Sequence, residues 1–216
     1  MASNYFLAYF PANSIPPSVL AEMLTATLEV NCLLWQTSPA AAEMETRVLD
    51  WLRQMIGLDE DFTGVIQDSA SSASLCAILS AGERASGWRT NEDGLSSAAL
   101  MAVYASSETH SSVEKDAKVA RIGRQFIRQI PVDAGFAMRP DAQPKPSPRT
   151  APTVSRPPLV VATLDTTGVG AIDPLRAIGD ICQREGVFLH VDAAWAGSAL
   201  NSQRLQMDDW WDQDRG

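Results

Sequence analysis

The chain has few of the features that mark secreted or membrane proteins. Its 216 residues include only three cysteines, Cys32, Cys76 and Cys182, with no CxxC pair, so a reducing compartment is the simplest expectation. The first ten residues lack a basic segment, and no apolar run is long enough to cross a bilayer. The net charge of −9 argues against nucleic acid or an anionic membrane as a partner. We therefore expect a soluble, cytoplasmic protein without a signal peptide.

Apolar residues are plentiful by contrast, at 45% of the chain, which is enough for a core. Short apolar runs alternate with capped helices, a pattern typical of an α/β fold with a mainly parallel sheet and helices on both faces. A stretch rich in proline, residues 143–158, interrupts this pattern and is interpreted as a linker. The expected strands lie near residues 64–67, 100–104, 125–130, 159–164 and 187–191.

The most informative stretch is residues 190–200, which follows the last expected strand. Asp192 lies where open α/β sheets bind their ligands, and mostly small side chains follow it. A carboxylate there can hold a cationic ring nitrogen, as in a site for pyridoxal 5'-phosphate (PLP), and small side chains let a flat ligand approach the backbone. An ordinary strand end with a solvated aspartate explains these residues alone equally well. No G-x-G-x-x-G motif follows a strand, which argues against a dinucleotide.

Three further positions are candidates for a ligand site or a helix cap. Ser69, Ala70 and Ser71 precede an apolar helix expected from Leu75, and small hydroxylated residues at a helix N-terminus suit a phosphate, although plain serine capping is the more ordinary interpretation. His110 lies in a strand-to-helix loop, where a lone histidine is a weak signal. Asp173 precedes a proline and is expected to cap the helix that Gly186 ends.

Six segments are informative when taken together: AYFPANS (8–14), LWQTSPAAAEMETRVLDWL (34–52), GVIQDSASSASL (64–75), YASSETHSSVEK (104–115), VVATLDTTGVGAIDPL (160–175) and HVDAAWAGSA (190–199). They resemble segments of the PLP-dependent group II amino-acid decarboxylases of the aromatic-L-amino-acid decarboxylase type, and they occur in that family's order, so chance agreement is not a sufficient explanation. The resemblance implies a fold-type I PLP-dependent transferase-like large domain and decarboxylation of an L-amino acid, with an aromatic one favoured.

The resemblance also implies roles for individual residues. Ser69, Ala70 and Ser71 match the phosphate cradle, and His110 matches the imidazole that stacks on the cofactor ring. Asp192 matches the carboxylate that pairs with the ring nitrogen, so His110 and Asp192 are the expected catalytic residues. No metal is expected. The remaining matches are Thr167 facing the cofactor, Ala194 against the ring, and Tyr9 and Phe10 in a substrate pocket that borders the partner of a homodimer.

The same resemblance divides the chain into regions. Residues 1–35 correspond to an N-terminal segment at the edge of the substrate pocket, and residues 36–200 to the PLP-binding large domain. Residues 201–216 form a tail that departs from the family pattern. The family's arm before AYFPANS and its C-terminal domain have no counterpart here, so we expect an incomplete chain.

One departure concerns the chemistry itself. The family's cofactor-binding lysine follows the HVDAAWAGSA segment in a His-Lys pair, but Lys115, Lys118 and Lys145 are the only lysines here and none matches it. The chain alone is therefore expected to be inactive, and a non-catalytic remnant that binds PLP weakly, or a partner, stays an alternative. Another fold-type I PLP enzyme, such as a cysteine desulfurase, is a third.

Overall fold

The computed structural model describes residues 14–94, 101–142 and 159–201. The chain forms two packed units, Met1–Val48 and Leu49–Gly216, and each is described by itself. In the first unit, α1 (Pro16–Leu28) begins at a proline and ends at Glu29, which has a left-handed φ of 47°. Helix α2 (Pro39–Met55) crosses from the first unit into the second. The functional regions expected from the sequence, with boundaries at residues 35 and 200, stay predictions.

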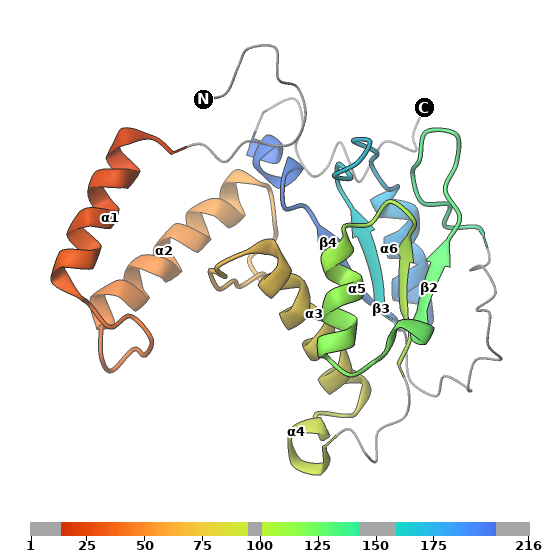
Figure 1. The fold of residues 1–216 in the computed structure, drawn as a ribbon, viewed down its shortest axis with the longest axis horizontal. Helices are drawn as coiled ribbons and strands as arrows, with labels where there is room; N and C mark the ends of the chain where they lie inside the picture. The colour runs from red at the N-terminus through yellow and green to blue at the C-terminus, as the bar shows by residue number, and fades with distance from the viewer. Residues whose placement is uncertain (1–13, 95–100, 143–158, 202–216) are drawn as a thin grey trace. The chain divides into compact units, whose positions relative to one another are not determined.

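The second unit is built on a four-stranded parallel sheet in the order β2-β1-β3-β4 (Figure 1). Its strands are β1 (Val103–Ser106), β2 (Ile127–Ile130), β3 (Leu159–Thr163) and β4 (Phe188–Asp192). The helices are α3 (Ala70–Ala85), α4 (Thr90–Asp93), α5 (Ser111–Val119) and α6 (Leu175–Glu185), with short 3-10 turns η2 (Arg124–Phe126) and η3 (Ala196–Asn201). Four of the five expected strands are confirmed, and with them the α/β fold class.

Helices cover both faces of this sheet, as the sequence predicted. Successive residues of a strand point to opposite faces, and β3 shows this directly. Val161 packs with Ile78 of α3 and Val113 of α5, whereas Ala162 packs with Leu175 of α6. Two separate cores therefore hold α3 and α5 against one face and α6 against the other (Figure 1).

The strand expected at residues 64–67 is wrong. No residue of this segment belongs to a strand, and Val65 and Ile66 are 66% and 61% exposed. The segment instead leads into α3, which begins at Ala70, five residues before the expected start. A short apolar run does not show whether a neighbouring strand exists to pair with it, and this one has none in the described sheet.

The role expected for Asp173 is also wrong. Helix α6 begins at Leu175 with Pro174 in the cap position, and Pro174 makes no side-chain cap hydrogen bond. The carboxylate of Asp173 is buried and accepts hydrogen bonds from the backbone N–H groups of Met138 and Thr163 instead. The end of α6 is as expected, because Gly186 takes the left-handed φ of 65°.

Two other expectations are limited by what the structure describes. The proline-rich stretch 143–158 and residues 202–216 of the expected tail lie outside the described residues. Among the described helices, none is both long enough and apolar enough to cross a membrane.

Candidate functional site

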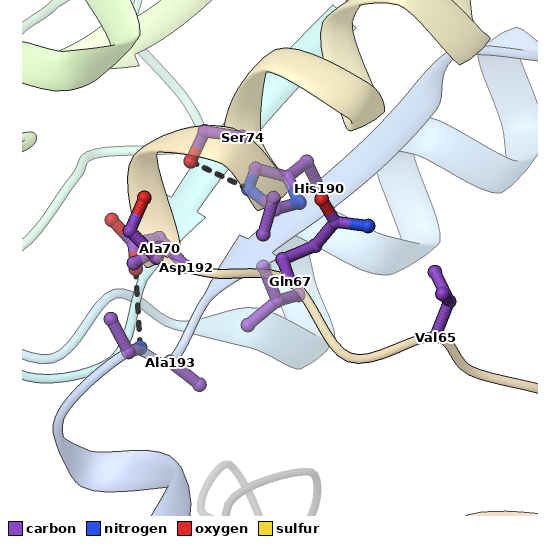
Figure 2. Close-up of a pocket in the computed structure, with 11 residues that line it drawn as sticks. Val65, Gln67, Ala70, Ser74, His190, Asp192 and Ala193 are labelled. Carbon is purple, nitrogen blue, oxygen red and sulfur yellow. Dashed lines mark hydrogen bonds between the residues drawn. The ribbon is translucent and has the colours of Figure 1, made fainter. Parts of the chain in front are cut away.

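The N-terminal end of α3 and the C-terminal end of β4 border an open cavity of about 340 Å³ within the second unit (Figure 2). It lies at the carboxyl end of the sheet, where open α/β folds bind ligands. Ala70 and Asp192 lie at the same end of the cavity, and His190 faces Ser74 further along α3. The lining residues are Val65, Gln67, Ser69, Ala70, Ala73, Ser74, His190, Val191, Asp192, Ala193 and Ala194.

The first turn of α3 supplies the polar end of this cavity. Ser69 is the N-cap, and its hydroxyl accepts a hydrogen bond from the N–H of Ser72 at 3.3 Å. The Ser72 hydroxyl in turn donates to the exposed carboxylate of Asp68. The other N–H groups of a first turn have no acceptor within the helix, and the helix dipole adds partial positive charge there. Ser69 and Ala70 therefore place a helix N-terminus that could bind an anion at this end of the cavity.

Asp192 supplies a carboxylate at the end of β4. Its backbone oxygen accepts a hydrogen bond from Leu164 N–H at 2.9 Å, which ties it to the end of β3. One side-chain oxygen, Oδ1, accepts the N–H of Ala194 at 3.2 Å. Small side chains at 193 and 194 leave space beside this carboxylate, so a flat ligand can lie close to the backbone.

His190 is the third polar group in the cavity. It lies two residues before Asp192, so both side chains point to the same face of β4. Its Nε2 lies 3.3 Å from the hydroxyl oxygen of Ser74, a buried residue of α3. Burial lowers the pKa of the His190 imidazole, and the charge of Asp192 offsets part of that shift. The lowered pKa favours the neutral form of the His190 ring near pH 7.

The structure brings together four of the residues predicted for the cofactor site, namely Ser69, Ala70, Asp192 and Ala194. Three others do not line the cavity. Ser71 is exposed on α3, Thr167 is exposed in the loop after β3, and His110 caps α5 by accepting the N–H of Ser112 at 3.2 Å. Thr167 follows β3, which pairs with β4, and His110 follows β1, the next strand in the sheet; because these strands are parallel, both loops lie at the edge of the sheet where β4 ends. Tyr9 and Phe10 lie outside the described residues.

Sequence reasoning missed Gln67, Ser74 and His190. The sequence spacing could have indicated two of them as site residues. His190 is two positions from Asp192 on a strand, and Ser74 is four positions from Ala70 on a helix, so each shares a face with a predicted site residue. Gln67 precedes the helix in an irregular segment, where no periodicity indicates its direction.

The cavity fits PLP by its chemistry. Its volume falls within the range of about 300–1,000 Å³ that is usual for small-molecule sites. It offers an anion-binding helix end for a phosphate and a carboxylate for a cationic ring nitrogen, with small residues between them. Of the two lysines in the described residues, Lys115 and Lys118, neither lines it. Both lie on α5, where Lys118 pairs with Glu114 at 2.6 Å.

Fold and cavity together define an α/β protein with a helix N-terminus beside a strand-end carboxylate. The conserved domain of pyridoxal-dependent decarboxylases matches residues 1–213, and the chain belongs to this family. This confirms the resemblance inferred from the six sequence segments.

Relatives and solved structures agree with this family. The bovine (Bos taurus) aromatic-L-amino-acid decarboxylase is 42% identical over 210 residues, which cover 92% of this chain and 42% of that protein. Human (Homo sapiens) histidine decarboxylase is 39% identical, covering 92% of this chain and 31% of that protein. Tryptophan decarboxylase of Catharanthus roseus, solved in complex with L-tryptophan, superposes with a TM-score of 0.79 at 32% identity, covering 95% of this chain and 44% of that chain. The chain thus spans less than half the length of these three proteins.

Proposed function

We propose that this chain supplies the cofactor cavity of a PLP-dependent carboxy-lyase that decarboxylates an L-amino acid, with an aromatic amino acid as the favoured substrate. One observation carries the proposal: an anion-binding helix end with Ser69 and Ala70 lies in the same cavity as Asp192 and Ala194. The relatives support it, because they are named as decarboxylases of aromatic amino acids and of histidine. The tryptophan complex supports an aromatic substrate.

Different residues of the cavity would bind different parts of PLP. Ser69 and the first-turn amides of α3 would bind the phosphate, while Asp192 would pair with the ring nitrogen. An anionic Asp192 would keep that nitrogen protonated, because a nearby negative charge favours the cationic form. When bound, PLP supplies the electron sink that accepts the electron pair left by loss of CO₂. His110 would stack on the ring and Thr167 would face it, as their positions in the family pattern imply.

A second candidate is a non-catalytic chain that binds PLP or a partner without turnover. The specific observation in its favour is that neither Lys115 nor Lys118 lines the cavity, and Lys145 falls in the proline-rich stretch. A covalent bond to PLP requires an amino group at one place over the ring. For the chain by itself, we therefore expect reversible binding of PLP and no release of CO₂.

One experiment tests both candidates. The chain is titrated with PLP, reduced with borohydride and digested, and pyridoxyl-lysine is sought by mass spectrometry while CO₂ release from aromatic amino acids is followed. We expect saturable binding with no stoichiometric adduct at any single lysine. A stoichiometric adduct at one lysine together with CO₂ release would refute the expected inactivity. Absence of any saturable binding would refute the cofactor cavity itself.

We also propose that the complete protein is a cytoplasmic homodimer. Support for a partner comes from α1, where the large apolar side chains are at least 50% exposed, including Leu20 and Leu24 at 61% and 64%. Support for a reducing compartment comes from the cysteines, because Cys32, Cys76 and Cys182 are all free. Sedimentation of the complete protein tests the dimer.

A further inference from the structure

The side-chain contact between Ser74 and His190 joins the two elements that form the cavity. Ser74 lies on α3 and is 2% exposed, and its hydroxyl is 3.3 Å from Nε2 of His190 on β4. The two residues are 116 positions apart in the sequence. Figure 2 shows this contact bridging the helix and the strand inside the cavity. It is therefore a long-range tie between elements rather than a local capping contact.

The contact between Ser74 and His190 lies close to both ends of the proposed ligand site, the first turn of α3 and the Asp192 carboxylate. Ser74 is one helical turn beyond Ala70, so it stands on the face of α3 that carries the anion-binding end. His190 is two residues before Asp192 and shares its face of β4. A contact between Ser74 and His190 therefore limits how far the first turn of α3 can move relative to the Asp192 carboxylate.

The surroundings of His190 favour a neutral imidazole that positions other groups over a protonated imidazole that carries charge. Val161, its pairing partner in β3, belongs to the same apolar cluster as Ile78 of α3, so apolar packing holds α3 against the sheet beside His190. A neutral imidazole here can accept or donate one hydrogen bond to Ser74. It also adds no positive charge beside Asp192, whose negative charge stays available to a cationic ring nitrogen.

We propose that His190, held by Ser74, is a positioning residue that sets the distance between the phosphate-binding end of α3 and the ring-nitrogen carboxylate of Asp192. This inference rests on the proposed PLP cavity. It gives His190 a role that requires no contact with the phosphate or with the ring nitrogen of PLP. A ligand that uses both ends at once needs the correct spacing. A ligand that uses only one end does not. The hydrogen bond between Ser74 and His190 should therefore affect the affinity for PLP but hardly affect the affinity for inorganic phosphate.

The test compares these two ligands on matched variants of the full 216-residue chain. Ser74→Ala and His190→Leu remove the hydrogen bond, while His190→Gln keeps a neutral group that can bond to Ser74. Ser80→Ala, at an exposed position of the same helix, is the control. Affinities for PLP and for inorganic phosphate are measured by titration, and urea unfolding confirms that each variant is folded.

We expect Ser74→Ala and His190→Leu to weaken PLP binding about 3- to 10-fold, the effect of losing one partly buried hydrogen bond. Phosphate affinity should change less than about 2-fold in every variant, and His190→Gln should recover most of the PLP affinity. Equal losses for both ligands, or no loss for PLP, would overturn the positioning role while leaving the PLP cavity standing. If wild-type protein binds no PLP, the cavity and the positioning role fail together. If His190→Leu does not fold, Ser74→Ala decides the outcome.

Discussion

We predict that Asp173→Asn destabilises the unit Leu49–Gly216 far more than the small chemical change suggests. Asp173 is 1% exposed. Its Oδ1 accepts the N–H of Met138 at 2.7 Å and its Oδ2 accepts the N–H of Thr163 at 2.8 Å. These amides lie 35 and 10 residues away along the chain. One carboxylate therefore holds three segments together, including the end of β3 that pairs with Asp192.

The magnitude follows from counting acceptors at this site. Asparagine keeps one oxygen but replaces the other with an NH₂ group, so one of the two backbone donors at Met138 and Thr163 would face another donor. A buried donor left unsatisfied costs about 1–3 kcal/mol, and a hydrogen bond to a charged group contributes about 1.5–3 kcal/mol. We expect a loss of about 2–4 kcal/mol for Asp173→Asn and about 3–6 kcal/mol for Asp173→Ala. Either is a large share of a typical total of about 5–15 kcal/mol.

Urea unfolding followed by circular dichroism measures these losses. Burial raises the pKa of Asp173, and the N–H groups of Met138 and Thr163 offset part of the rise, so the assay is run at about pH 8 to keep the carboxyl ionised. The exposed Asp61 provides the control, and Asp61→Asn should change stability by less than about 0.5 kcal/mol. Equal unfolding midpoints for Asp173→Asn and Asp61→Asn, with unchanged slopes, would refute the reasoning.

Two further predictions concern the histidines. His110→Phe keeps a flat ring, so it should bind PLP about 2- to 10-fold more tightly than His110→Ala; equal affinities in a fluorescence titration would identify His110 as a bystander. Burial lowers the pKa of His190 despite the nearby Asp192, so the folded state binds fewer protons than the unfolded state, and stability should fall as the pH drops below the ordinary imidazole range. His190→Gln should lack this component; identical pH profiles of the urea midpoint for the wild type and His190→Gln would contradict the prediction.

The parts of the fold that the sequence predicts are those set by local patterns. Gly186 ends α6 because a left-handed residue is needed there, and the apolar run before Asp192 forms β4 between capped elements. The segment 64–67 has the same local character but no strand beside it in the described sheet. Pairing depends on distant residues, and an apolar run of four residues does not contain that information.

The same distinction separates the predicted from the missed parts of the site. Asp192 and Ser69 both line the cavity, and their positions could be predicted because a strand end and a serine-rich stretch before a helix each leave a local signature; their roles toward a cofactor stay predictions. Asp173 was assigned to a cap because Asp-Pro is a local signal, yet the amides that it binds include one 35 residues away. The contact of His190 with Ser74 depends on how α3 packs against β4, and no short pattern encodes that packing.

The separation of the two halves of the cavity has a consequence for the order in which the protein is made. Ser74 leaves the ribosome 116 residues before His190, a delay of roughly 6–23 s at about 5–20 residues per second. Through that interval α3 can form, but no cavity exists for a ligand, because its other wall is not yet synthesised. Ligand binding can therefore act only after β4 has been synthesised: it can retain the native state once β4 has docked, but it cannot nucleate the fold.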